Sequence, residues 1–291
     1  MADNLPLAFQ TEFDAMVTAA FQDIAVLGGT MYEKKNITGK YCQFRRRSKG
    51  AATPHVRNAP VTPLNLGLTV ATCELTDWDA VERLDPMDLI KINWDDQRVV
   101  AESLGFAIGR RADQMRIDAM EAASPQQIAV DYGSAGTNTA LNVEKINHAR
   151  ALLLSAGVPD GPGSWHAAIS ALALEGALND TKIGSQDYNV LKSLYEGSLK
   201  EYSGFTFHVI GDRDEGGLPT DASGYRKCYF WHHNSIGYAE AMEEGMSGRT
   251  RIDWSPDYQG WLLCAKLSAG SKVIESEGIV ECLVDESKAA S

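Results

Sequence analysis

The sequence has no apolar run long enough to cross a membrane. A spanning helix needs about 20 mostly apolar residues, and no stretch of the 291 residues approaches that length. The first residues, Met1 to Pro6, show neither the basic start nor the apolar core of a signal peptide. We therefore expect a soluble protein that is made in the cytoplasm and has no membrane partner.

Cysteine is scarce, and its five copies lie far apart in the chain: Cys42, Cys73, Cys228, Cys264 and Cys282. No CxxC pair is present, so neither a zinc ribbon nor a disulfide framework is expected. On a strand, Cys228 and His232 would face one way and His233 the other. The sequence therefore predicts no metal site, and the cysteines are interpreted as buried thiols.

Motifs for catalysis are also missing. The chain has no GxSxG elbow, no ordered Ser, His and Asp triad, and no GK[ST] after the glycines of residues 157–163. The acidic pairs Asp95-Asp96 and Glu243-Glu244 suit helix ends and solvated turns better than acid-base chemistry. We expect no catalytic residue, no cofactor and no enzymatic activity.

Charge is unevenly distributed around a net value of -12. No acidic residue lies between Glu33 and Glu74, an interval that contains Lys34, Lys35, Lys40, Arg45, Arg46, Arg47, Lys49 and Arg57. An acidic segment follows directly, with Glu74, Asp77, Asp79, Glu82, Asp85, Asp88, Asp95 and Asp96. The negative total argues against a protein whose main task is to grip nucleic acid.

The basic cluster at Arg45 to Lys49 has three interpretations. It is a contact with another subunit, a solvated charge run, or a nucleic-acid patch in which Tyr41 and Phe44 stack on bases. A long basic segment that cannot fold into its own core is costly to order. We therefore favour the subunit contact.

Helical periodicity predicts three main helices, over Phe9–Leu27, Asp95–Ala122 and Asn142–Gly157. The second would be about 40 Å long. The third starts at an Asn142 N-cap, with Leu141 and Ile146 placed as a hydrophobic staple. The first is either an ordinary packed helix or an arm that docks on a neighbour or a scaffolding protein.

Strand patterns dominate elsewhere. Tyr41–Phe44 and the alternating run Leu64–Thr72 predict a two-stranded excursion with a basic tip and one buried face. The acidic stretch up to Asn93 is given no strand. Further strands are predicted at Ile128–Val130, Trp165–Ile169, Phe205–Ile210, Tyr225–His233, Trp261–Leu267, Ser271–Ser276 and Ile279–Val284, with short helices at Ala171–Leu178 and Asn189–Gly197. This order is α+β, without regular βαβ alternation.

Three stretches carry a resemblance to a known family. Leu194–Phe205 is similar to a helix-to-strand passage, Tyr229–Ala239 to the strand and turn after it, and Gly270–Val280 to a closing hairpin. With the order of elements, they resemble the Hong Kong 97-type major capsid protein of tailed bacteriophages. The resemblance implies an N-terminal arm (1–33), an extended β loop (34–73), a peripheral domain with a spine helix (74–140, spine 95–122), an axial domain (141–245) and return strands (246–291).

The resemblance also implies a function. The chain would form hexamers and pentamers of an icosahedral virion capsid, assembled in the host cytoplasm around double-stranded DNA that it contacts non-specifically. Scaffolding, portal and decoration proteins would be its other partners. The expected inter-subunit contact residues are Lys40, Arg45, Arg46, Arg47, Lys49, Arg57, Asp77, Asp79, Glu82, Asp85 and Asp88.

Two alternatives stay open at this point. An encapsulin-like nanocompartment shell has the same fold, and a cargo enzyme in place of DNA would distinguish it. An oligomeric soluble enzyme would instead form a small defined oligomer with a ligand pocket.

Overall fold

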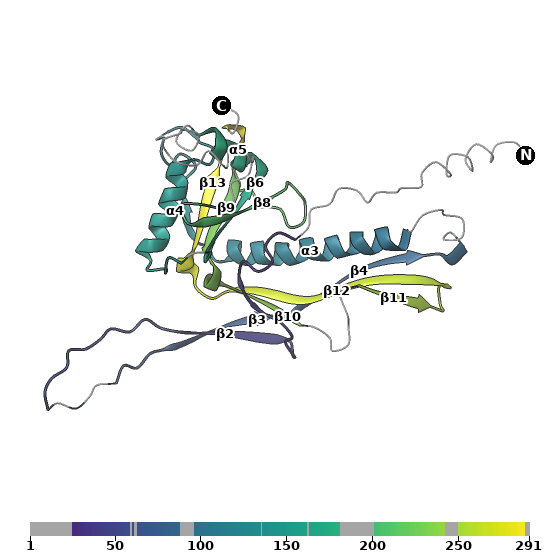
Figure 1. The fold of residues 1–291 in the computed structure, drawn as a ribbon, viewed down its shortest axis with the longest axis horizontal. Coiled ribbons are helices and arrows are strands. Elements are labelled where there is room, and N and C mark those ends of the chain that lie inside the picture. Colours follow the sequence, from purple (N-terminus) through teal and green to yellow (C-terminus); the bar gives the residue numbers. More distant parts are fainter. Residues whose placement is uncertain are drawn as a thin grey trace, which may run out of the picture.

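The computed structural model describes residues 25–58, 60, 63–87, 96–134, 136–161, 163–180, 201–241 and 250–288. These residues form two sheets, three helices of at least two turns, and a separate hairpin that projects from the body (Figure 1). The predicted helix Asn189–Gly197 lies outside them. Of the predicted helix Phe9–Leu27 only residues 25–27 are described, and they are not helical.

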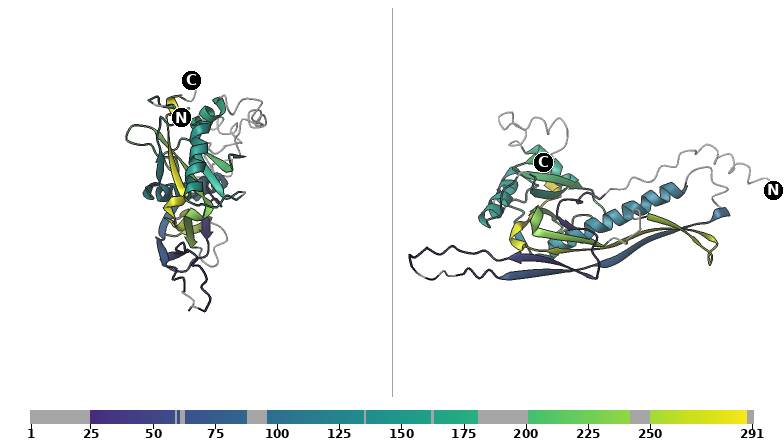
Figure 2. Two further views of the ribbon diagram at one scale, coloured as in Figure 1. Left: turned by 90° about the vertical axis from the view of Figure 1, so that its left-hand side faces the viewer. Right: turned by 60° about the horizontal axis from the view of Figure 1, so that its bottom comes forward.

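A five-stranded sheet forms the elongated half of the molecule. Its strands are β1 (Tyr32–Lys34), β10 (Ile236–Ala241), β12 (Gly260–Val273), β11 (Thr250–Ser255) and β4 (Thr76–Leu84). β12 is central, because β4 pairs along one side of it and β10 and β11 share the other. The long helix α3 (Asp96–Ala122) lies along this sheet, where Ile108 and Ala112 pack near Ala265 and Leu267 (Figures 1 and 2).

A six-stranded sheet forms the second half. Its order is β5 (Gln126–Ile128), β13 (Ile279–Val284), β9 (Arg226–His232), β6 (Trp165–Ser170), β8 (Phe205–Ile210) and β7 (Glu201–Tyr202). Every residue of β6 and β13 is buried. Helices α4 (Val143–Ser155) and α5 (Ala171–Asn179) contribute to the same apolar core. The expected domain division remains a prediction. β5 belongs to the proposed peripheral segment 74–140 but pairs in the six-stranded sheet, and β10 belongs to the proposed axial segment 141–245 but pairs in the five-stranded sheet.

The projecting hairpin consists of β2 (Tyr41–Arg47) and β3 (Leu68–Glu74), which pair only with each other. A long connection joins them, and Figures 1 and 2 show it extending away from both sheets. β3 continues through Leu75 into β4. The hairpin is thus attached to the body by the strand that edges the five-stranded sheet.

Several predicted elements are confirmed. α3 begins one residue later than predicted, and β13 has the predicted bounds. At α4 the Asn142 side chain accepts a hydrogen bond from the Lys145 amide at 2.8 Å, while Leu141 and Ile146 are fully buried. The capping signals were therefore sufficient to place this helix.

The prediction of two strands at 261–267 and 271–276 is wrong, because β12 runs unbroken from Gly260 to Val273 and residues 274–276 are not in a strand. Gly270 looked like a turn residue, but it marks a close crossing: a Cβ there would collide with the backbone oxygen of Glu74. The stretch Gly270–Val280 is also not a hairpin. It carries the chain from β12 in one sheet to β13 in the other.

The acidic stretch predicted without a strand forms β4. Trp78 and Ala80 pack toward α3, whereas Asp77 and Asp79 point to the other side. The sequence did not predict this strand, because its acidic residues obscured the alternation of exposed and half-buried side chains. β1, β10 and β11 were not predicted as strands, and the strand predicted at 128–130 is instead 126–128, since a turn follows in which the Tyr132 amide donates to Ala129.

Candidate assembly surface

The two faces of the hairpin differ in burial. Arg45 is paired with Val70 and Arg47 with Leu68, so these four side chains share one side of the ribbon. With Tyr41 they form what we call the outer face. Its apolar members are exposed, at 57% for Tyr41, 55% for Leu68 and 41% for Val70. The prediction that the apolar positions of this strand form a buried face is therefore wrong within one chain.

The opposite face anchors the hairpin to the body. Phe44 is 1% exposed and belongs to a small core with Cys42, Cys73 and Leu75. A Cβ at Gly237 would lie 2.6 to 2.7 Å from three atoms of the Phe44 ring, so only glycine lets the ring lie on the β10 backbone. The sequence did not predict this contact, because a glycine within a strand, such as Gly237, does not indicate which side chain packs against it.

Three of the predicted basic contact residues have partners in their own chain. Lys40 Nζ lies 2.8 Å from Glu74 Oε1, and this carboxylate raises the pKa of Lys40. Arg46 pairs with Glu275. Lys49 Nζ lies 3.1 Å from Glu277 Oε2.

Arg45, Arg47 and Arg57 form no ion pair with any other residue that the structure describes. The first two lie on the outer face, and all three are exposed. These three arginines therefore have no carboxylate partner within the described part of the subunit.

The predicted acidic contact residues lie mostly on β4. Asp77, Asp79 and Glu82 are exposed and have no ion pair among the described residues. Val81, between the last two, is 45% exposed and faces the same side as Asp79. Asp85 accepts a hydrogen bond from the Met87 amide at 2.8 Å; Asp88 lies outside the described residues.

The structure does not bring the unpaired acidic and basic groups together. β4 runs along the five-stranded sheet, whereas the hairpin extends in the opposite direction (Figure 1). The outer face of the hairpin has exposed arginines beside apolar side chains, and the exposed side of β4 has Asp77 and Asp79 beside Val81, so the two surfaces differ in charge. Within one chain they cannot meet.

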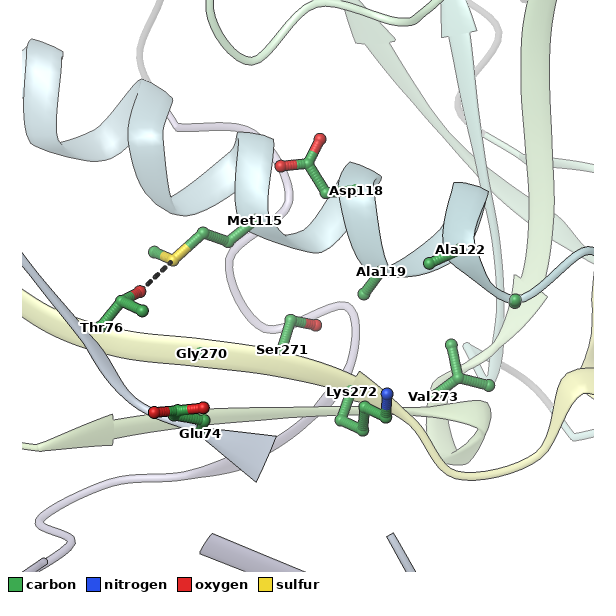
Figure 3. A pocket seen from close by; sticks show the side chains of 11 residues that line it. Glu74, Thr76, Met115, Asp118, Ala119, Ala122, Gly270, Ser271, Lys272 and Val273 are labelled. Carbon is green, nitrogen blue, oxygen red and sulfur yellow. Dashed lines mark hydrogen bonds between the residues drawn. The ribbon is translucent and has the colours of Figure 1, made fainter. Parts of the chain in front are cut away.

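A pocket of about 310 Å³ lies where the hairpin joins the body (Figure 3). Its floor is made of small residues, among them Ala119, Ala122 and Gly270, and Glu74 and Lys272 stand at its rim. No nucleophile with an adjacent base lines it. Its lining gives no arrangement for catalysis.

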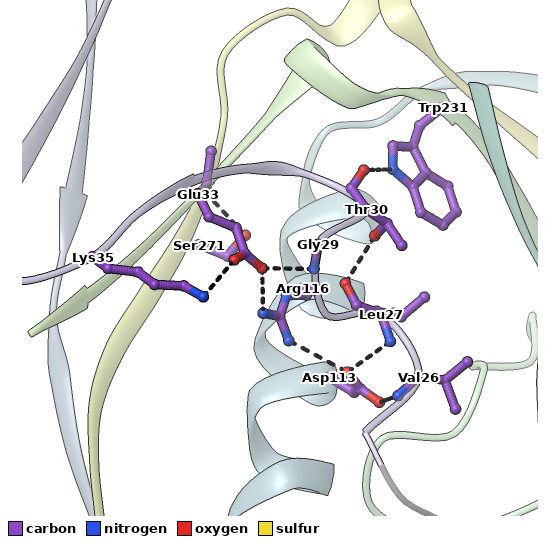
Figure 4. Close-up of polar contacts among 11 residues, drawn as sticks. Val26, Leu27, Gly29, Thr30, Glu33, Lys35, Asp113, Arg116, Trp231 and Ser271 are labelled. Atoms are coloured by element: carbon purple, nitrogen blue, oxygen red, sulfur yellow. Dashed lines mark hydrogen bonds and ion pairs between the residues drawn. The ribbon is translucent and has the colours of Figure 1, made fainter. Parts of the chain in front are cut away.

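A buried polar network holds the segment that precedes β1 (Figure 4). The carboxylate of Asp113, fully buried in α3, accepts the amides of Val26 at 2.8 Å and Leu27 at 3.2 Å. Arg116 bridges Asp113 and Glu33, at 3.4 and 3.1 Å. Because Val26 and Leu27 donate to Asp113, their amides are not used in a helix, which corrects the predicted helical end at Leu27.

Electrostatics favour the ionised form of Glu33 in this network. Burial alone would raise the pKa of Glu33, but the Gly29 amide and Arg116 outweigh burial and lower it. Arg213 adds a second cation beside Asp113 at 3.2 Å. Sequence reasoning missed the network, since a charged residue on the inner side of an amphipathic helix resembles any other surface charge.

Four histidines lie near one another on β6, β8, β9 and η2 (His233–Ser235), which follows β9: His166, His208, His232 and His233. His208 Nε2 lies 3.2 Å from His166 Nδ1. Burial lowers the pKa of His166 to about 4 and also lowers the pKa values of His208 and His232. No group of three or more His, Cys, Asp or Glu among the described residues has the geometry of a metal site, and Cys228 lies instead opposite Cys282.

The comparisons with known proteins identify the family. A family model described as phage capsid protein matches residues 5–286. The chain belongs to the phage capsid protein family. It is therefore a structural subunit of the virion capsid, and neither the encapsulin nor the enzyme alternative is favoured.

Solved capsids have the same fold as this capsid protein. The head of Helicobacter pylori bacteriophage KHP40 is similar with a TM-score of 0.71 at 11% identity, over 93% of this chain and 94% of that one. The capsid of cyanophage P-SCSP1u gives 0.68 at 14% identity, over 93% and 91%. Mycobacterium phage Che8 gives 0.67 at 12% identity, over 94% and 95%. No curated protein sequence matches the chain.

These likenesses confirm the α+β fold of the Hong Kong 97 type that the sequence predicts. Within the part of the capsid protein that the structure describes, no helix has the length and apolar character of a membrane span.

Proposed function

We propose that this capsid protein closes into an icosahedral shell of hexamers and pentamers around double-stranded phage DNA, with the outer face of one hairpin lying on strand β4 of a neighbour. The observation that carries the contact is the set of unmatched charges. Arg45, Arg47 and Arg57 on one element and Asp77, Asp79 and Glu82 on another have no ion pairs within the described residues of their own chain.

The free energies of apolar burial and of exposed ion pairs indicate different roles for the apolar and the charged side chains. Burying Leu68 or Val70 fully would contribute about 1.5 to 3 kcal/mol each, whereas an exposed ion pair contributes about 0 to 1 kcal/mol. Apolar contact therefore supplies most of the affinity. The charges select the partner strand and its register, and they make assembly sensitive to salt.

The remaining partners follow from the same proposal. A net charge of -12 keeps the inner wall from binding packaged phosphates tightly, so DNA contact is non-specific. The five cysteines are all free and buried, which suits assembly in a reducing host cytoplasm. Scaffolding, portal and decoration proteins complete the set of partners that we propose.

Charge reversal tests the contact. Replacing Arg45 and Arg47 by glutamate, or Asp77 and Asp79 by lysine, should lower particle yield about tenfold in sedimentation and negative-stain microscopy. The four substitutions together should recover part of the yield, because the attraction is restored with opposite sign. Arg45→Lys with Arg47→Lys is the matched control, and it should assemble normally.

Two results would contradict the proposal. Normal yield from both reversed variants would remove the hairpin contact. Particles that hold a cargo protein and no DNA would remove the genome-enclosing role while leaving shell formation intact.

A further inference from the structure

Arg46 lies on the other side of the ribbon from its neighbours Arg45 and Arg47. Successive residues of a strand point to opposite faces, and Arg46 is half-buried while the two flanking arginines are exposed. Its guanidinium contacts the carboxylate of Glu275, with 32% and 30% of the two side chains exposed. Consecutive arginines therefore face different surroundings.

Glu275 belongs to the connection between the two sheets. The short helix η3 (Ser276–Gly278) joins β12 of the five-stranded sheet to β13 of the six-stranded sheet, and Glu275 directly precedes it. Lys49 contacts the same connection through Glu277, at 3.1 Å. Arg46 and Lys49 of the hairpin thus both bind the linker between the sheets.

The linker is itself tightly held. The amides of Ile274 and Glu275 donate to the Ser235 carbonyl at 2.8 and 3.1 Å. Ser235 ends η2 (His233–Ser235), the crossing from β9 to β10. A Cβ at Gly278 would collide with the Ser235 side chain, so the two crossings lie in direct contact.

Lys49 makes a third connection. Its Nζ donates to the Ala156 carbonyl at the C-terminal end of α4, at 3.1 Å. A cation is favourable at this end of a helix. The hairpin is therefore held by its root on Gly237 and, further along, by the linker and the six-stranded half.

We infer that Arg46 and Lys49, with Glu275 and Glu277, form an intramolecular latch that fixes the direction of the hairpin relative to both sheets. These residues position the loop and do not bind the neighbouring subunit. The latch holds the ribbon so that Arg45 and the rest of the outer face point away from the body. Its assembly readout rests on the proposed shell function.

The decisive experiment compares the pair within one chain and between chains. Arg46→Glu and Glu275→Arg are made singly, combined in one chain, and coexpressed as two singly substituted chains. Each single variant should lower particle yield about tenfold, because like charges push the hairpin from the linker. The double variant in one chain should return to within about threefold of wild type, whereas the coexpressed single variants should stay low.

A second readout does not need particles. Amide hydrogen exchange of the unassembled full chain should be about tenfold faster at Ile274 and Glu275 in Arg46→Glu, because the linker opens locally. Arg45→Glu, a reversal one residue away on the outer face, is the matched control and should leave these amides unchanged. This measurement separates a failed latch from a failure of wild-type chains to form shells.

The latch is overturned by any of three results. Coexpressed single variants that recover as well as the double variant would place the pair between subunits. Single variants with wild-type yield and wild-type exchange would show that the pair positions nothing. A double variant that fails to recover, while circular dichroism shows it folded, would exclude a charge pair as the cause.

Discussion

The six-stranded half and the hairpin use the same kinds of residue in opposite ways. Strand β13 has all six of its residues buried against its own chain, whereas the hairpin strand β3 exposes Leu68 and Val70 to solvent. Both strands have β-branched and apolar side chains. What separates them is whether a second layer of the same chain covers them.

This difference indicates which part of the subunit has its apolar side chains covered before assembly. In the six-stranded half, β6 and β13 are buried entirely by their own chain, so substitutions in these strands should act on folding. The hairpin leaves apolar and charged groups uncovered, so substitutions there should act on association. Three measurements test this division.

The largest effect on folding should come from Trp231. Its side chain is fully buried, and its indole donates to the Thr30 carbonyl at 3.1 Å. Trp231→Ala should lower the free energy of unfolding by about 3 to 5 kcal/mol in denaturant titration of the unassembled subunit. Trp254→Ala, at a site 48% exposed, is the control and should cost less than about 1 kcal/mol. Equal losses would contradict the link between burial by the subunit's own chain and the cost to folding.

A smaller effect should come from acid. The pKa of His166 is about 4 in the folded chain against 6.5 without burial, so the unfolded chain binds more protons between these values. Stability should therefore fall as the pH drops from about 6.5 to about 4, by at most about 3 kcal/mol from this group. Asp113 and Glu275 oppose the effect at His208 and His232.

The histidine substitution makes the test specific. His166→Gln should flatten the pH dependence of the unfolding free energy, and His55→Gln, on the exposed loop, is the matched control. An unchanged slope in His166→Gln would show that the acid effect arises elsewhere.

The smallest effect on folding should come from the outer face. Leu68→Ser and Val70→Ser should change the free energy of unfolding by no more than about 0.5 kcal/mol, since both side chains are solvated. Particle yield should nevertheless fall, because the buried apolar area at the contact is lost. Loss of stability without loss of assembly would reverse the interpretation of this face.

Sequence reasoning succeeded where the signal is local. The cap at Asn142 and the long apolar stripe of α3 each depend on residues within a few turns of one another. It failed where the partner is distant. β4 looked like an acidic loop because the side that contacts α3 shows only after folding, and Gly270 looked like a turn because the chain crossing it comes from Glu74.

Composition predicted which segment forms the assembly surface, but not which face of the hairpin each arginine occupies. The interval without acidic residues located the hairpin, but it could not tell Arg46, which meets Glu275, from Arg45 on the opposite face. That distinction needs the pairing register and the position of a linker more than two hundred residues away in sequence. The network around Asp113 was missed for the same reason.

The position of the last strands has a consequence for biosynthesis. β12 lies at the centre of one sheet and β13 between two strands of the other, and both come from the final residues of the described chain. A nascent chain on the ribosome has its hairpin strands and its long helix early, but neither sheet can close until β12 and β13 have also been synthesised. Closure of the two sheets is thereby delayed until these strands have emerged, and a product truncated before β12 lacks a stable body on which to display its exposed hairpin.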